Sequence, residues 1–133
     1  MEKLVFNIPP IAKGRPRIST RGGFARAYTP TLTRRYELAI AHLAREQWPH
    51  EPLKNAIKAR ITFYMGIPKS LSMAKRRHPI VKPDLDNLTK AIKDALNGIV
   101  WADDALIVQC DAQKIYDWAH RRVGVELQIE EVE

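Results

Sequence analysis

The chain has 133 residues, of which 45% are hydrophobic and 28% are charged, and its formal net charge at pH 7 is +7. This length fits one domain over residues 1–133, and no apolar run approaches the roughly twenty residues that a membrane span requires. The single cysteine, Cys110, excludes an intramolecular disulfide, and the N-terminus has no signal-peptide layout. We therefore expect a cytoplasmic protein with a buried free thiol at Cys110.

Positive charge is concentrated in the N-terminal part of the chain. No Asp or Glu lies between Lys3 and Tyr36. The eight cations of this stretch are Lys3, Lys13, Arg15, Arg17, Arg21, Arg26, Arg34 and Arg35. A cation placed against a phosphate releases condensed counterions, so a basic face favours nucleic acid as the partner. The alternative is a charge that serves solubility alone.

The first third of the chain predicts one strand, one basic loop and one helix. Alternating apolar residues predict a strand over residues 4–8, which Pro9-Pro10 ends because proline cannot continue a ladder. Residues 11–28 are rich in Gly, Ser, Thr, Arg and Pro, and predict a loop that wraps DNA and orders on contact. Thr29-Pro30 supplies an N-cap and a first-turn proline, and helical spacing of apolar residues predicts a helix up to Trp48.

The middle of the chain predicts a second strand, a second basic loop and a second helix. Strict alternation of apolar and polar residues predicts a strand over residues 57–65. Residues 69–82 are polar and basic, and they predict a loop. A helix with one apolar stripe follows from Asp84 and ends at Asn97-Gly98, which is a C-terminal stop signal.

Two further strands complete the chain. Alternating patterns predict strands over residues 106–116 and 123–129, separated by a turn over residues 117–122. Because strands adjacent in sequence commonly pair, we expect these two to form a hairpin. The order β-α-β-α-β-β predicts an α/β (α+β) layer structure, in which two main helices cover at least one face of a four-stranded mixed sheet.

Carboxylates flank the second helix. Asp84 and Asp86 lie at its start, and Asp103-Asp104 follow its end. Pro83 disfavours helical geometry at the residue before it, so Asp84 fits the N-cap position with extended backbone and can converge with Asp86 at the mouth of the helix. A strand that begins near Asp104 would point that residue toward the helix layer. We therefore expect three carboxylates to gather at one end of the sheet.

Oxygen-rich clusters of this kind suit hard divalent cations, with Mg²⁺ the usual choice and Mn²⁺ an alternative. One ion can lower the pKa of an attacking water, and two can clamp the attacking and leaving oxygens of a phosphodiester. Lys90 lies one turn after Asp86 and could stabilise charge on the phosphate. Each residue also has a structural interpretation: Asp84 as a helix cap, Asp86 and Lys90 as a surface ion pair, and Asp103-Asp104 as a turn.

Basic residues near these acids are candidates for contact with a DNA backbone. They come from the N-terminal loop and from the segment before the second helix. The candidates are Lys13, Arg15, Arg17, Lys69, Lys75, Arg76, Arg77 and Lys82.

The motifs around the carboxylates are specific enough to indicate a family. Residues 82–91, followed by 94–98 and 101–104, closely resemble the signature of the RusA family of Holliday junction resolvases. Residues 13–17 and 28–30 are similar to the phage and prophage branch of that family. The resemblance therefore extends over nearly the whole chain.

The resemblance implies a homodimeric endonuclease that cuts four-way DNA junctions by paired, symmetric, Mg²⁺-dependent nicks in DNA recombination and repair. It implies that Asp84, Asp86 and Asp104 are the essential acids and metal ligands, and that Lys90 is the catalytic lysine. Asp103 is then their neighbour and an auxiliary candidate for the metal.

Two other functions fit the same residues. The first is a nuclease for another branched DNA substrate, such as a flap. The second is a non-catalytic DNA-binding module, in which the acids serve only as caps and ion pairs.

Overall fold

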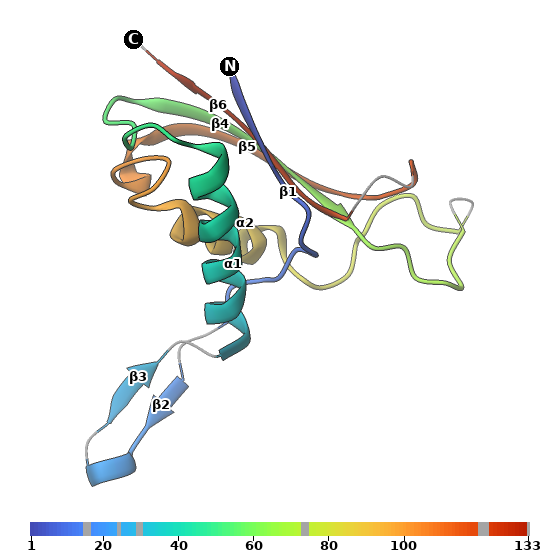
Figure 1. Cartoon of the computed structure of the whole chain (residues 1–133). Coiled ribbons are helices and arrows are strands. Elements are labelled where there is room, and N and C mark those ends of the chain that lie inside the picture. Colours follow the sequence, from blue (N-terminus) through green and yellow to red (C-terminus); the bar gives the residue numbers. More distant parts are fainter. Residues whose placement is uncertain (15–16, 24, 29–30, 73–74, 120–122, 133) are drawn as a thin grey trace.

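The computed structural model of the chain describes residues 1–14, 17–23, 25–28, 31–72, 75–119 and 123–132. Two helices pack against one face of a four-stranded mixed sheet, and a two-stranded hairpin projects beyond the helices (Figure 1). The main elements are β1 (Glu2–Phe6), β2 (Arg17–Ser19), β3 (Arg26–Tyr28), α1 (Thr31–Gln47), β4 (Ile57–Met65), α2 (Leu85–Leu96), β5 (Ile107–Tyr116) and β6 (Gly124–Glu131). This arrangement confirms the predicted α+β class.

The four strands of the main sheet have the order β1-β6-β4-β5. Strand β4 lies antiparallel to β6 on one side and parallel to β5 on the other. The expected hairpin between β5 and β6 is therefore wrong. The reason is that β4, α2 and β5 form a crossover unit, in which the helix returns the chain so that β5 pairs parallel to β4. Strand β6 then takes the remaining side of β4.

The N-terminal basic segment is partly regular. Strands β2 and β3 pair antiparallel, with Arg17 opposite Tyr28 and Ser19 opposite Arg26. The prediction of a loop over residues 11–28 is therefore wrong for these two strands, which are too short to show an alternating pattern. The predicted N-cap Thr29 and first-turn Pro30 lie outside the described residues.

The two helices bury the stripes that their spacing predicts. Helix α1 ends one residue before Trp48, in agreement with the sequence. Helix α2 is followed by Asn97 and by Gly98 with a positive φ of 81°, which confirms the predicted stop. The residues that α2 buries are Leu88, Ala91, Ile92, Ala95 and Leu96. No helix in the described part of the chain is long and apolar enough to cross a membrane.

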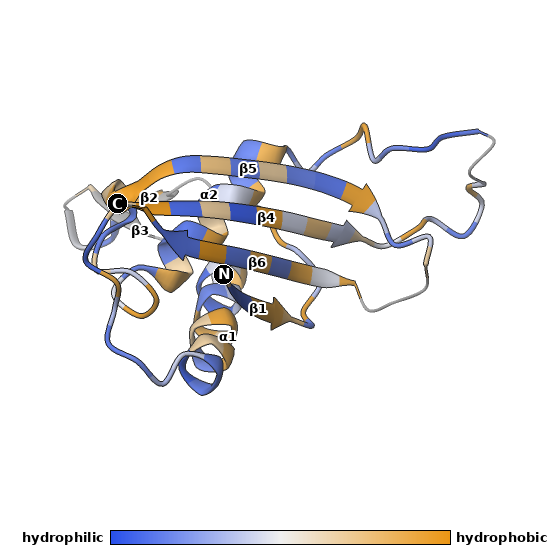
Figure 2. Cartoon of the chain, turned by 90° about the horizontal axis from the view of Figure 1, so that it is seen from above, coloured by the Kyte–Doolittle hydropathy of each residue, from blue (hydrophilic) through white to orange (hydrophobic). Residues whose placement is uncertain are grey.

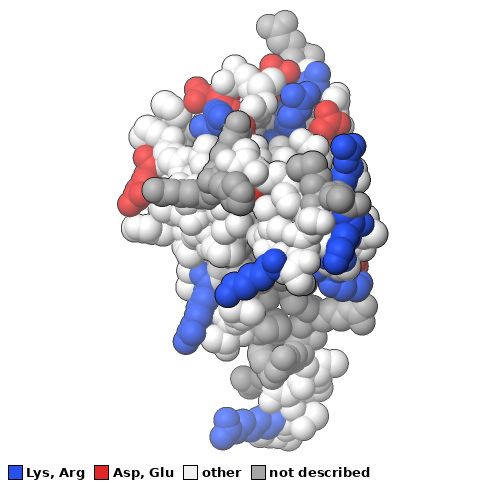
Figure 3. All heavy atoms as spheres, turned by 90° about the vertical axis from the view of Figure 1, so that its right-hand side faces the viewer, with Lys and Arg blue, Asp and Glu red and all other residues white. Residues whose placement is uncertain are grey.

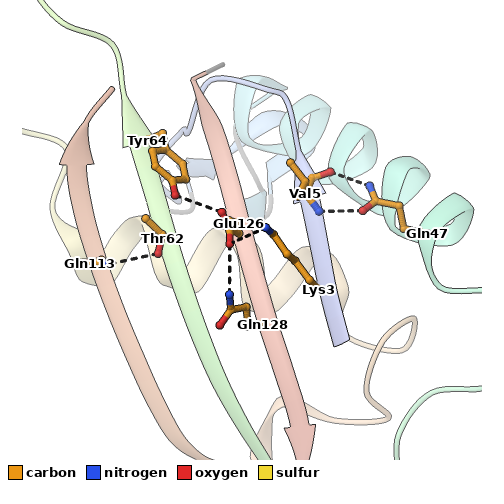
Figure 4. A network of polar contacts seen from close by, with 8 residues as sticks. All are labelled: Lys3, Val5, Gln47, Thr62, Tyr64, Gln113, Glu126 and Gln128. Carbon is orange, nitrogen blue, oxygen red and sulfur yellow. Dashed lines mark hydrogen bonds and ion pairs between the residues drawn. The ribbon is translucent and has the colours of Figure 1, made fainter. Parts of the chain in front are cut away.

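The two faces of the sheet differ in character. The face that meets the helices carries buried apolar side chains, such as Ile61 and Phe63 of β4, whereas the other face is largely polar and faces away from them (Figure 2). On the polar face Glu126 accepts hydrogen bonds from Tyr64 at 3.2 Å and from Gln128 at 3.3 Å, and it pairs with Lys3 at 3.2 Å (Figure 4). On this face, which the two helices do not cover, polar side chains therefore contact one another between neighbouring strands.

Cys110 lies in β5 and is half-buried rather than buried as predicted. Burial raises the pKa of its thiol above the ordinary value, an effect that Lys93 opposes. The thiol is half-exposed because β5 is an edge strand, with a neighbour on one side only.

Gly124 begins β6, which pairs antiparallel with β1 and lies beside the end of that strand. Its φ is 159°, and an added Cβ would overlap the carbonyl oxygen of Phe6. We expect Gly124→Ala to lower the free energy of unfolding by about 3 kcal/mol, because backbone must move to accept the methyl group. The matched control is Gly66→Ala, whose Cβ would meet only Val123 Cγ1 at 3.8 Å. Urea unfolding of the two variants measures the difference, and equal losses would contradict the clash.

Candidate active site

Asp84 is the N-cap residue of α2 by its backbone but not by its side chain. Its φ of −68° and ψ of 144° are extended, as predicted, and its carbonyl oxygen accepts from the Leu88 amide at 3.1 Å. The carboxylate makes no capping hydrogen bond; it pairs instead with Lys82 Nζ at 2.8 Å. The hydrogen bond and charge of Lys82, with a smaller effect of Lys114, hold the pKa of Asp84 below its ordinary 3.8. Asp84 is thus an ionised, accessible carboxylate.

Lys114 fixes the segment that leads into α2. From β5 its Nζ donates to the carbonyl oxygens of Val81 at 2.7 Å and Pro83 at 2.8 Å. The sequence analysis assigned no role to this residue. The sequence does contain a signal for it. Lys114 lies two residues from both Ala112 and Tyr116 in the strand, so it shares with them the face that packs against the helices.

Asp86 and Lys90 lie on the exposed surface of α2, one turn apart. Within the described part of the chain, neither side chain makes a hydrogen bond or an ion pair. Their structural interpretation as a surface ion pair is therefore not supported. Both charged groups are open to an incoming ligand.

Asp103 and Asp104 have different roles in the short 3-10 turn over Asp104–Leu106. The Asp103 carboxylate caps this turn by accepting from the Ala105 amide at 2.9 Å. The Asp104 amide donates to Asn97 Oδ1 at 2.8 Å, and the Asp104 carboxylate has no partner in the described chain. The strand that was expected to begin near Asp104 begins at Ile107, because the turn precedes it. The capping interpretation fits Asp103 and leaves Asp104 as the free acid.

The carboxylates occupy opposite ends of α2. Asp84 and Asp86 lie at its start, whereas Asn97, the residue that caps its end, holds Asp104. A helix of 12 residues spans about 18 Å at 1.5 Å per residue. Among the described residues no three acidic, histidine or cysteine side chains form a group that could hold a metal ion. Among the described residues of one chain the three carboxylates therefore do not gather at one end of the sheet, and their assignment as metal ligands stays a prediction.

Lys13, predicted to contact DNA, is engaged inside the protein. Its Nζ lies 2.5 Å from Glu37 Oε1 on α1 and 3.2 Å from Asp94 Oδ2 on α2, and its side chain is only 17% exposed. Its amide also donates to the Asn87 carbonyl oxygen at 3.0 Å, in the turn of α2 that contains Asp86. Lys13 therefore joins the N-terminal segment to both helices.

The other predicted DNA contacts divide by their surroundings. Lys69, Lys75, Arg77 and Lys82 are exposed, whereas the guanidinium of Arg76 lies over the ring of Tyr116 at 5.7 Å. Arg15 and the side chain of Arg17 lie outside the described residues. On the side of the molecule shown in Figure 3, Lys and Arg side chains extend from the sheet to the hairpin, while most of the Asp and Glu side chains in view lie in the upper half.

Comparison with known proteins agrees with the motifs around these carboxylates. Residues 7–130 match the family model described as endodeoxyribonuclease RusA. The chain belongs to the RusA family. It is 32% identical over 132 residues to the uncharacterized protein YqaN of Bacillus subtilis (strain 168), in a match that covers 92% of this chain and 91% of that protein. The predicted family is thereby confirmed, and with it the class of DNA endonuclease.

We expect Lys13→Met to lower the free energy of unfolding by about 1 to 3 kcal/mol, because it leaves two partly buried carboxylates without their cation. Burial lowers the pKa of Lys13, but its contacts with Glu37 and Asp94 outweigh burial, and the net pKa lies above 10.5. The contribution is therefore fully present below pH 10.5 and is lost as the pH rises through the folded-state pKa.

Unfolding of both proteins at pH 7 and above pH 10.5 checks this prediction, since the difference between them should shrink at the higher pH. Lys69→Met is the matched control on the exposed surface and should change stability by less than about 0.5 kcal/mol. A stable Lys13→Met protein that merely binds DNA more weakly would assign Lys13 to the DNA interface instead.

Proposed function

We propose that this protein is a divalent-metal-dependent endonuclease that resolves four-way DNA junctions by paired, symmetric nicks in DNA recombination and repair. Membership of the RusA family supports the class of reaction. The observation that carries the proposal is the state of the three acids: Asp86 and Asp104 have no partner in the described chain, and Asp84 is turned away from the helix it begins. Apart from the pair of Asp84 with the exposed Lys82, these carboxylates make no contact within the described chain.

The separation of the acids along α2 supports a dimer. One chain offers Asp84 and Asp86 at one place and Asp104 at another, about 18 Å away along α2. In a dimer with two-fold symmetry every contact occurs twice. If Asp84 and Asp86 of one copy meet Asp104 of the other, two complete sites form, and two sites are what paired nicks on a symmetric junction require.

The chemistry of the acids fits a hard cation. All the donors are carboxylate oxygens, which suit Mg²⁺ or Mn²⁺, although the described residues of one chain present too few of them together. A bound ion would supply Lewis acidity and a nucleophilic water. Lys90, one turn from Asp86 and without a partner in the described chain, is placed to neutralise charge that develops on the phosphate.

The segment that precedes α2 offers cations to the DNA backbone. Lys69, Lys75 and Arg77 are exposed in the segment that leads to Asp84. Lys114 anchors the end of that segment, so contacts made there are coupled to the position of Asp84. Cations of this kind position a phosphate backbone without reading its sequence.

The dimeric arrangement makes a sharp prediction for two inactive variants. Asp86→Asn and Asp104→Asn should each lose cleavage of a four-way junction by at least about a hundredfold, because each removes a ligand from both sites. When the two proteins are mixed and allowed to exchange subunits, one site of each heterodimer regains all its acids. The mixture should recover about a quarter of the wild-type nicking, with single nicks in place of paired ones. Cleavage products on a denaturing gel measure this.

Asp103→Asn is the matched control, because asparagine also caps a helical turn and the change keeps the neighbouring Asp104. It should cleave within about threefold of the wild type. If the mixed variants stay inactive although subunits exchange, each site belongs to one chain. Cleavage of flaps and three-way junctions as fast as four-way junctions would instead indicate a broader branched-DNA nuclease, and cleavage that persists in chelator would exclude the metal.

A further inference from the structure

The two edges of the main sheet differ in whether the protein covers them. At the β1 edge, Gln47 at the end of α1 closes the backbone of Val5: the Val5 amide donates to Gln47 Oε1 at 2.8 Å, and Gln47 Nε2 donates to the Val5 carbonyl oxygen at 2.7 Å (Figure 4). β1 is also short, with five residues. This edge cannot accept another strand at Val5 without losing both hydrogen bonds.

The β5 edge is open. β5 has ten residues, contains no proline, and among the described strands pairs only with β4. Within the described chain, the other backbone hydrogen bonds of β5 lie at its two ends, where the Ile107 amide donates to the Asp104 carbonyl oxygen and the Tyr116 carbonyl oxygen accepts from the Trp118 amide at 2.9 Å. Val108, which the ladder with β4 skips, is 65% exposed. The unpaired backbone groups of a strand this long are a template for a strand from another chain, although Asp111, Lys114 and the register shift at Val108 are features that restrict which strand can pair there.

We propose that β5 pairs with β5 of a second copy of this chain, antiparallel about a two-fold axis perpendicular to the sheet, so that two four-stranded sheets form one sheet of eight strands. The proposal rests on the dimer of the proposed function and adds where its interface lies. A perpendicular axis keeps the helices of both copies on the same face, so the polar face stays continuous as well.

The placement of the acids singles out a second copy as the occupant of this edge. Lys114, near the end of β5, holds the residues that precede Asp84, whereas Asp104 lies just before the start of β5. In an antiparallel pair the start of one strand lies beside the end of the other. The β5 pairing therefore brings Asp104 of each copy toward Asp84 and Asp86 of the other, at both ends of the interface.

The side chains of β5 restrict the register. Cys110 and Ala112 are small and pack toward the helix layer, so the α2 helices of two copies can approach one another above them. Asp111 alternates with them on the polar face, and a register that placed it opposite its own copy would be destabilised by like charges. The two registers nearest the middle of β5 that avoid this repulsion place either Cys110 or Ala112 opposite its own copy, and Asp111 then faces an uncharged glutamine, Gln109 or Gln113.

The first experiment measures self-association by sedimentation of Val108→Lys. This position is exposed and makes no contact that the fold needs, so the variant should keep its melting temperature while its dimer dissociation constant rises by at least about tenfold. The matched control is Leu32→Lys on α1, where the leucine is 63% exposed. It should associate as the wild type does. A Val108→Lys dimer as tight as the wild type, or a wild type that stays monomeric at all concentrations tested, would overturn the proposal.

A second experiment uses the single cysteine as a probe of the register. Under mild oxidation at alkaline pH, either the wild type, through Cys110, or the double variant Cys110→Ser with Ala112→Cys should form a disulfide-linked dimer on a non-reducing gel. The control places the cysteine at Leu32 in the Cys110→Ser background and should remain monomeric. If neither β5 cysteine is linked, or the Leu32 cysteine is linked equally well, the β5 interface is wrong.

Junction cleavage separates this inference from the proposed function. If both hold, Val108→Lys cleaves poorly at low protein concentration and recovers as the concentration rises. If Val108→Lys cleaves as the wild type does at every concentration, the proposed function is supported and the β5 interface is refuted. A wild type that is cross-linked through β5 but leaves junctions intact would keep the interface and refute the function.

Discussion

Helix α2 is fixed at both of its ends, and the placement of every candidate catalytic acid depends on this. Before the helix, Lys114 holds two backbone carbonyl groups, and after it Asn97 holds the amide of Asp104. Between these anchors the apolar stripe of α2 is buried in the core. Because β5 supplies Lys114 and begins just after Asp104, strand and helix constrain each other. Neither pair of carboxylates can move without disturbing the packing of α2 or one of these hydrogen bonds.

Local patterns predicted the elements well, because a periodic apolar face is a local property of the sequence. β4 and α2 were found with nearly their observed bounds, since each buries one clear stripe. The pairing of strands was not local. β5 and β6 follow each other in sequence, yet β4 separates them, because the crossover through α2 had already placed β5 at the edge. The β2–β3 hairpin escaped prediction because three residues per strand carry too little pattern.

The identity of the acids could be predicted, but their surroundings could not. The motif singled out Asp84, Asp86 and Asp104. Asp86 and Asp104 have no partner in the described chain and Asp84 pairs only with the exposed Lys82, which agrees with that choice without testing it. What no spacing rule could reveal is that Asp103 caps a turn while its neighbour is free, since both residues fit either role in sequence. Lys13 is the opposite case. A cation in a basic run suggests DNA, but tertiary contacts with Glu37 and Asp94 occupy its charge.

The distance between the two groups of acids bears on how a nuclease of this kind would be controlled. A strongly basic protein binds duplex DNA without regard to sequence, so most encounters in a cell are with the wrong substrate. A single chain that carries Asp84 and Asp86 at one end of α2 and Asp104 at the other has no complete acid group in its described part. In the proposed dimer, a group of all three acids forms only where two copies meet. Cleavage would then depend on assembly as well as on DNA binding, and a monomer on an ordinary duplex would leave it intact.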